Sequence, residues 1–142
     1  MSMEELIIDA ENQVLGRLAS KTAKELLKGK RVIIVNAEKA VISGSPDSIF
    51  NNFLEKIQRG DPYHGPFYPR KPDKILRRVI RGMLPKKPRG REALKRLRVC
   101  ISVPKEISER DIKKFAESEN KLKCKHITLG KLSERLGAKK TW

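Results

Sequence analysis

Residues 6–35, LIIDAENQVLGRLASKTAKELLKGKRVIIV, predict a strand, a helix and a second strand in succession. Apolar side chains recur at helical spacing from Val14 to Leu27, and Asn12 is suited to capping the start of that helix. The β-branched run at residues 32–35 does not alternate with polar residues, which is typical of a parallel strand covered on both faces. The stretch therefore predicts an α/β protein with a mostly parallel sheet.

Strands and helices continue to alternate through the middle of the chain. Residues 40–42 predict a short strand, and Pro46 suits the first position of a helix whose apolar stripe ends at Gly60. Apolar and polar residues alternate over residues 97–103, so another strand is expected there. No linker or internal repeat divides the sequence, and we expect a single domain over residues 1–142.

The C-terminal part of the chain carries weaker patterns. A helix capped by its first residue is expected at residues 108–115, and a second brief helix at residues 132–136. Residues 117–125 are polar and predict irregular structure. Trp142 could pack on the body of the protein or on a partner, so the sequence assigns no role to this tail.

Residues 70–98 hold thirteen Lys or Arg against two acids. From Pro72 to Met83 the pattern is that of an amphipathic helix, with cations on one side and apolar residues on the other. The Pro-rich residues 84–91 then continue the positive charge and predict an extended, rigid loop. A solvated surface normally mixes both signs of charge, so this segment predicts a polyanionic partner, namely nucleic acid. The cations that we expect to bind it are Arg70, Lys71, Lys74, Arg77, Arg78, Arg81, Lys86, Lys87, Arg89, Arg91, Lys95 and Arg96, and Arg98 could extend the track.

The whole chain carries a formal net charge of +16, which suits nucleic acid or an anionic membrane surface. No stretch approaches the about 20 apolar residues needed to cross a membrane. The ends of the sequence carry neither a signal peptide nor a lipidation motif. We therefore expect a cytoplasmic protein with no membrane partner.

Metal and enzyme chemistry find little support in the residue pattern. A zinc site could be drawn from Cys100, Cys124, His64 and His126, but no CxxC or HxxxH spacing exists. Reduced thiols in small spaces of the core are the preferred interpretation, and no cofactor is expected. The turn at residues 43–47 could hold a phosphate, yet it lacks a glycine-rich phosphate motif, so a structural turn is preferred. Neither histidine has a carboxylate at motif spacing, so we expect no enzyme and no small-molecule substrate.

Two groups of side chains keep alternative interpretations. Aromatic residues among the prolines just before the basic segment could stack on unpaired bases or pack their loop against the body of the protein. This group consists of Tyr63, His64, Phe67 and Tyr68. Cations on the outer face of the first helix could make a second contact, although a solvated surface is preferred. This second group consists of Arg17, Lys21 and Lys24.

Several short blocks of the sequence form a distinctive set. They include VLGRLAS at residues 14–20, VNAEK at residues 35–39 and, most distinctively, VIRGMLPK at residues 79–86. Taken together, these blocks resemble the ribosomal large-subunit protein number thirteen family. Their order and spacing extend the resemblance over residues 7–103. Lys30 is followed at once by the second strand, without the insertion of bacterial members, so the chain is similar to archaeal-type members.

The resemblance implies a three-layer α/β/α fold around a four-stranded parallel sheet, with the basic Pro-rich loop as an extension. It also implies a non-catalytic constituent of the large ribosomal subunit in the cytoplasm. Such a protein binds large-subunit rRNA beside neighbouring ribosomal proteins and supports subunit assembly and translation. The alternatives are a phosphate-handling enzyme at residues 43–47 and a free-standing RNA- or DNA-binding regulator, which would not co-sediment with ribosomal particles in high salt.

Overall fold

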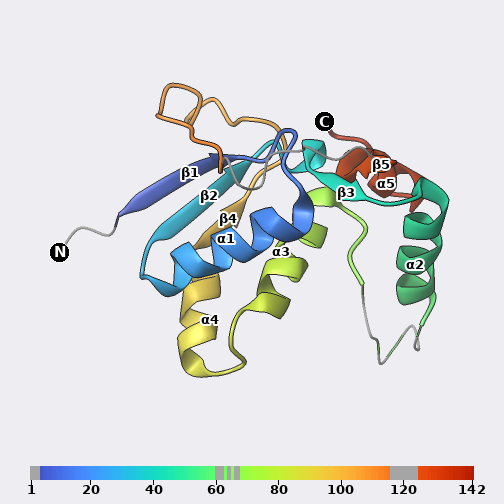
Figure 1. The fold of residues 1–142 in the computed structure, drawn as a ribbon, viewed down its shortest axis with the longest axis horizontal. Helices are drawn as coiled ribbons and strands as arrows, with labels where there is room; N and C mark the ends of the chain where they lie inside the picture. The colour runs from blue at the N-terminus through green and yellow to red at the C-terminus, as the bar shows by residue number, and fades with distance from the viewer. Residues whose placement is uncertain (1–3, 60–62, 64, 66–67, 116–124) are drawn as a thin grey trace.

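The computed structural model describes residues 4–59, 63, 65, 68–115 and 125–142. A parallel sheet of three strands forms its centre, in the order β1 (Glu5–Asp9), β2 (Arg31–Val35) and β4 (Leu97–Val99) (Figure 1). The central strand β2 pairs with β1 along its whole length and with β4 through residues 32–34. Val32, Ile34 and Val35 are fully buried. The β-branched run is therefore covered on both faces, as its lack of alternation predicts.

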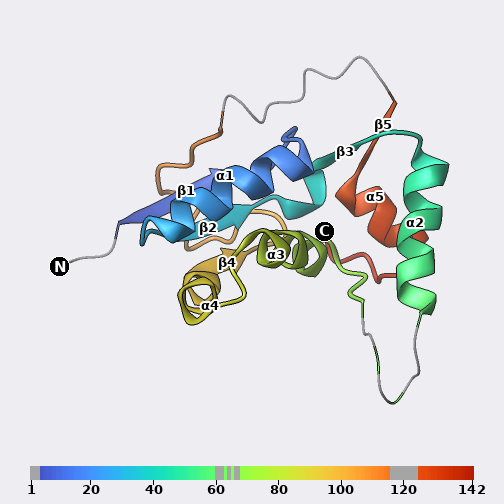
Figure 2. The same cartoon turned by 60° about the horizontal axis from the view of Figure 1, so that its bottom comes forward.

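Helices cover one face of this sheet. α1 (Leu15–Leu27), α3 (Pro72–Met83) and α4 (Pro88–Lys95) lie together on it, and α1 contacts both of the others (Figures 1 and 2). Leu18 and Leu26 of α1 and Ile75 and Ile80 of α3 are fully buried in the cluster that contains Ile34 of the central strand. Burial of these apolar stripes fixes the outward direction of the opposite, cationic face of α3.

The helix α1 begins later than predicted. Its cap position is occupied by Val14, whereas Asn12 lies in a turn with a φ of 59°. Gln13 accepts a backbone hydrogen bond from the amide of Val41 at 2.8 Å, and Val14 forms a parallel bridge with the same residue. Because residues 13–14 are extended to make this pairing, the helix starts only at Leu15.

The opposite face of the sheet is covered by residues 100–113, which form turns and bends among the described residues. Ile7 and Ile33 pack there against Ile107. The predicted helix at 108–115 is wrong, because Lys113 instead bridges to Ile8 at the edge of β1. The amide of Lys113 donates to the carbonyl of Ile7 and its carbonyl accepts from Asp9, both at 2.9 Å. In the part of the chain that is described, a helical layer thus covers one face only.

The predicted strand over residues 97–103 is shorter in the structure, since β4 ends at Val99. Cys100 still donates to the carbonyl of Ile34 at 2.7 Å. Ser102 then adopts a φ of 57° and turns the chain, and its amide and hydroxyl both donate to the buried carboxylate of Glu38. These hydrogen bonds to Glu38 hold Ser102 in a turn, so the chain leaves the sheet although the sequence continues to alternate.

A separate antiparallel pair replaces the expected fourth parallel strand. β3 (Val41–Ser43) pairs with β5 (His126–Thr128), and no four-stranded parallel sheet is present in the described ranges. Parallel neighbours need a crossover of about a dozen residues. Only the short helix η1 (Ala37–Lys39) and its two flanking residues separate β2 from β3, so the two strands cannot pair in that way.

Two further helices complete this half of the molecule. α2 (Pro46–Gln58) begins at the predicted proline, and α5 (Leu129–Arg135) follows β5 directly (Figure 1). Gly130 of α5 lies so close to the indole of Trp142 that a Cβ there would be 3.0 Å from its nitrogen. The terminal tryptophan therefore packs on the body of the protein.

The basic segment forms two helices with a short connection between them. α3 has the predicted bounds, but the predicted extended loop over residues 84–91 is wrong beyond Lys87, because α4 starts at Pro88. Proline in the first turn of a helix costs no hydrogen bond. Gly90 permits the close packing that follows, since a Cβ there would collide with the carbonyl oxygen of Pro85.

Candidate nucleic-acid interface

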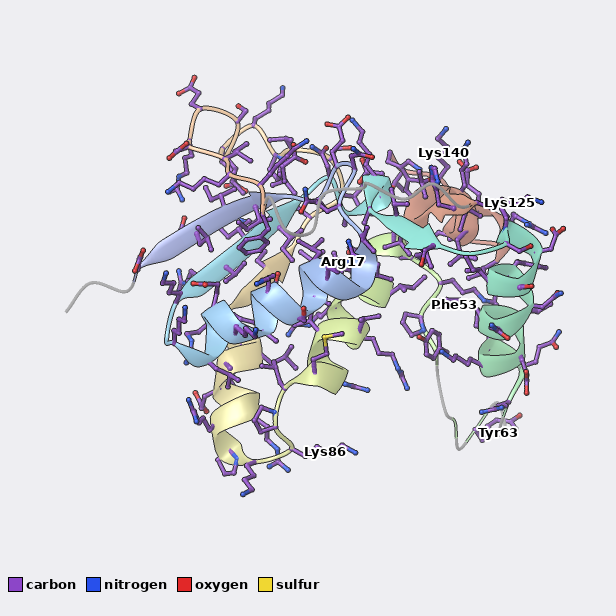
Figure 3. All side chains as sticks on the ribbon, viewed as in Figure 1. Arg17, Phe53, Tyr63, Lys86, Lys125 and Lys140 are labelled. Carbon is purple, nitrogen blue, oxygen red and sulfur yellow. The ribbon has the colours of Figure 1, made fainter. Side chains whose placement is uncertain are left out.

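The predicted cations lie on α3, on α4 and on the loops beside them. Figure 3 shows Lys86 at the far end of the connection between the two helices, directed away from the body of the protein. Of the twelve, three are half-buried, namely Arg77, Arg78 and Arg96. The other nine are exposed, so the segment presents most of its charge to solvent.

One of the half-buried arginines connects α3 to the end of α4. The guanidinium of Arg77 donates to the carbonyl of Leu97 at 2.9 Å and to the carbonyl of Leu94 at 3.4 Å. A basic side chain is favoured near the last carbonyls of a helix, and the carbonyl of Leu94 lies in the last turn of α4, whereas that of Leu97 belongs to β4. Arg77 therefore holds the scaffold as well as adding charge to the surface.

Two more arginines hold the carboxyl end of α1. Arg96 donates to the carbonyl of Leu26 at 2.6 Å, and Arg89 donates to the carbonyl of Leu27 at 3.3 Å. A cation is favoured at this end of a helix by the helix dipole. These contacts join α4 to α1 and help to orient the basic helix pair on the sheet.

Two other cations of the segment pair with described acids: the exposed side chain of Lys95 pairs with Glu92 at 3.3 Å, and Arg98 pairs with Glu106 at 3.0 Å. Of the two acids in the segment, Glu92 is thus used locally, and Asp73 lies in the first turn of α3, where a carboxylate favours the helix dipole. Neither neutralises the outer surface. The uncompensated set is Arg70, Lys71, Lys74, Arg81, Lys86, Lys87 and Arg91.

Among the aromatic residues before the basic segment, Tyr68 packs against the body of the protein. Its ring meets Phe53 of α2 edge-on, with centroids 5.9 Å apart, and the guanidinium of Arg78 lies 4.6 Å from its centroid. Burial raises the pKa of the Tyr68 phenol above 10.0, although the charge of Arg78 opposes the shift. Tyr68 thus packs its loop onto α2 and α3. Tyr63 is 88% exposed, and His64 and Phe67 lie outside the described residues.

The sequence pattern did not predict a cationic pocket on the face of the sheet that carries no helices. It has a volume of about 340 Å³, and Arg31, Arg98 and Arg110 line it with Lys95 and Arg96. Two carboxylates partly balance it: Glu106 pairs with Arg98 at 3.0 Å, and Glu5 pairs with Arg110. For Arg98, the alternation of apolar and polar residues along the strand predicts that its side chain points away from the side of the buried Leu97. Only the fold brings Arg31 and Arg110 beside it.

The other candidate sites show no converging polar groups. Ser45 occupies the cap position of α2 as predicted, but its side chain makes no capping hydrogen bond. Cys100 is buried, and burial raises the pKa of its thiol. Cys124 lies outside the described residues, and the described ones contain no cluster of three or more His, Cys, Asp or Glu that could hold a metal. None of the described helices is long and apolar enough to cross a membrane.

The outer face of α1 matches the preferred interpretation in part. Arg17 and Lys24 are exposed, and Figure 3 shows Arg17 near the start of the helix. Lys21 is half-buried. These side chains lie on α1, whereas the predicted cations lie on α3, on α4 and on the loops beside them.

Comparison with known proteins gives a consistent result over most of the chain. Residues 3–106 match the family described as Ribosomal protein L13. The chain is 54% identical to the large ribosomal subunit protein uL13 of Methanopyrus kandleri, with 92% of this chain and 86% of the relative covered. The uL13 proteins of Archaeoglobus fulgidus and Methanosarcina barkeri are 47% and 46% identical, with 92% and 94% of this chain and 86% and 98% of the relatives covered.

Proposed function

This chain belongs to the ribosomal protein L13 family, and we propose that it is a structural, non-catalytic constituent of the large ribosomal subunit. Its role is to bind large-subunit rRNA and so to support subunit assembly and translation. It acts in the cytoplasm, as part of the ribosome, beside neighbouring large-subunit proteins. The archaeal relatives, named for the large subunit, support this assignment.

The observation that carries the rRNA-binding role is the row of cations without acidic partners on α3, the connecting loop and α4. Such a surface repels itself in isolation and gains when a polyanion neutralises it. Phosphate contacts release counterions from the nucleic acid, and this release dominates affinity for a charged protein surface. The contacts proposed are those of the exposed side chains Lys74, Arg81, Lys86 and Arg91 and their neighbours.

Arginines that donate to backbone carbonyls add rigidity to this surface. Arg77, Arg89 and Arg96 donate to carbonyls of α1, α4 and β4, so the two basic helices are held in one arrangement before RNA binds. A surface that is already ordered loses less conformational entropy on binding. RNA is favoured over DNA because compact rRNA offers grooves, bulges and single-stranded loops that proteins recognise by shape.

Incorporation into particles tests this proposal. A variant with Lys74→Gln, Arg81→Gln and Lys86→Gln removes three exposed charges without touching the carbonyl contacts. A matched control removes three exposed charges elsewhere through Lys105→Gln, Lys125→Gln and Lys139→Gln. We expect the wild-type and control proteins to co-sediment with large subunits in high salt and the first variant to be depleted from them. Equal incorporation of all three proteins would contradict the proposed interface.

A further inference from the structure

A groove of about 530 Å³ lies between the last turn of α3 and α4. Its apolar lining comes from Leu84, Pro85 and Leu94. The groove depends on Gly90, because any Cβ there would push the carbonyl of Pro85 and the connecting loop away from α4. Its volume falls within the about 300–1,000 Å³ of pockets that hold small organic groups.

Cations surround this apolar lining. Arg78, Arg81, Lys86 and Arg91 line the same groove, and no acidic residue does. A neighbouring pocket of about 370 Å³ shares Arg78 and Arg81 and continues the positive charge along α3. The combination of apolar lining and cationic border differs from a surface that only contacts phosphates, because phosphate gains nothing from leucine and proline side chains.

We propose that this groove takes one unpaired nucleobase of the rRNA, with the flanking phosphates on Arg81, Lys86 and Arg91. The inference rests on the proposed function and names the element of RNA that the interface recognises. A base offers apolar faces to Leu84 and Leu94, while its own backbone supplies the negative charge for the border. A base paired within a duplex cannot enter, because its faces are covered by its neighbours.

The arginine content of the border favours RNA over an acidic protein segment. A guanidinium is flat and stacks on bases, which an ammonium group cannot do. Arg78 lines the groove, and its guanidinium lies 4.6 Å from the ring centroid of Tyr68, so it already contacts one aromatic ring. A base that enters beside Arg78 extends this stack.

Gly82 permits a test that fills the groove without altering charge. It lines the groove, and a Cβ added to it would meet nothing within 4 Å, so Gly82→Leu places apolar atoms in the space proposed for the base. Gly16→Leu is the matched control, because Gly16 is also helical and exposed and has nothing within 4 Å of its Cβ position. Both changes replace a glycine by a better helix former, so neither is expected to unfold the protein.

The affinities to compare are those for a short purine-rich single-stranded RNA and for an RNA duplex of the same length. We expect Gly82→Leu to weaken single-strand binding by roughly 5- to 150-fold, the loss for one stacked base. Duplex binding should change less than about twofold, and Gly16→Leu should affect neither RNA.

Three results would overturn the proposal, and they separate its failure from failure of the proposed function. If Gly82→Leu weakens neither RNA, or both equally, the base site is wrong while rRNA binding stands. If it spares RNA affinity but blocks incorporation into large subunits, a protein segment occupies the groove. If wild-type protein binds neither RNA in a salt-dependent way, the proposed function fails as well.

Discussion

Individual arginines of the basic segment differ in what they contact. Those bonded to backbone carbonyls contribute to stability, and the exposed ones are available to bind RNA. Arg96 donates to the carbonyl of Leu26 across 70 residues of sequence, whereas Arg81 is exposed and makes no ion pair with a described acid. Sequence patterns cannot make this distinction, because both are arginines in one cationic run. Only the packing of α4 against α1 reveals which guanidinium is already used within the protein.

We predict that Arg96→Gln lowers the free energy of unfolding by about 1–3 kcal/mol, because it leaves the carbonyl of Leu26 without its charged donor. Arg81→Gln should stay within about 0.5 kcal/mol of wild type, as is usual for exposed sites. Urea denaturation of both variants at one pH gives the comparison. A larger loss for Arg81→Gln than for Arg96→Gln would contradict the division into scaffold and surface arginines.

Glycines on either side of the connection between α3 and α4 make a second residue-level contrast. Gly90→Ala should destabilise the protein by about 1–3 kcal/mol or more, because its Cβ collides with the backbone of Pro85. Gly82→Ala has open space around its Cβ and should be neutral or stabilising by up to about 1 kcal/mol. We expect the denaturation midpoint to fall for Gly90→Ala and to stay level or rise for Gly82→Ala. Equal shifts of the two midpoints would contradict the close approach of Gly90 to Pro85.

At the scale of elements, the sequence-based predictions agree with the structure where a local residue pattern determines the element. β2, α2 and α3 are found where periodicity and the helix-starting prolines place them. Two of the wrong predictions involve pairing between distant parts of the chain. Residues 41–43 pair with the C-terminal strand β5, and Lys113 bridges to β1 instead of continuing a helix. The secondary-structure propensity of a short stretch of sequence does not show which distant residues it will pair with.

The same limit applies to the candidate interface. Its location on α3 was predictable, because the spacing of Ile75, Leu76 and Ile80 defines the buried side and therefore the cationic side. The helical form of residues 88–95 was not, since Pro85 and Pro88 on either side of two lysines resemble a loop unless Pro88 is recognised as a helix start. The pocket that joins Arg31 to Arg110 exists only in the folded chain.

Tyr68 packs against α2 and α3, and the titration of its phenol reports that packing. With Tyr63→Phe, Tyr68 is the only tyrosine that remains. Burial raises its pKa above 10.0 in the folded state, so its phenolate should appear at higher pH in native than in urea-unfolded protein. Ultraviolet absorbance of the phenolate measures both. A native value equal to or below the unfolded one would contradict this packing.

The raised pKa also fixes the direction of a stability change. A group with a higher pKa in the folded state stabilises fully below its unfolded pKa, and this contribution is lost as the pH rises through the folded value. Relative to a Tyr68→Phe variant, the protein should therefore lose stability only above about pH 10. An equal difference between the two proteins at pH 8 and pH 11 would contradict this linkage.

At the scale of the whole molecule, the fold separates two kinds of surface. Apolar residues of both sheets, α1, α3 and α5 share one buried cluster, while the charge of +16 remains largely outside it. The helix pair α3–α4 projects from one face of the sheet and carries the densest part of that charge (Figure 2). A stable core thus presents a cationic surface that the core itself does not neutralise.

The salt dependence of binding to a large-subunit rRNA fragment tests this central claim most directly. With ~6–10 phosphate contacts, affinity should fall by about 10³–10⁵ between roughly 50 and 200 mM salt. The variant with Lys74→Gln, Arg81→Gln and Lys86→Gln should reduce the slope of log K against log salt by about 2–3, at 0.7–0.9 per contact. The control with Lys105→Gln, Lys125→Gln and Lys139→Gln should keep the wild-type slope. A flat salt response, or equal slopes for all three proteins, would show that RNA does not neutralise this surface.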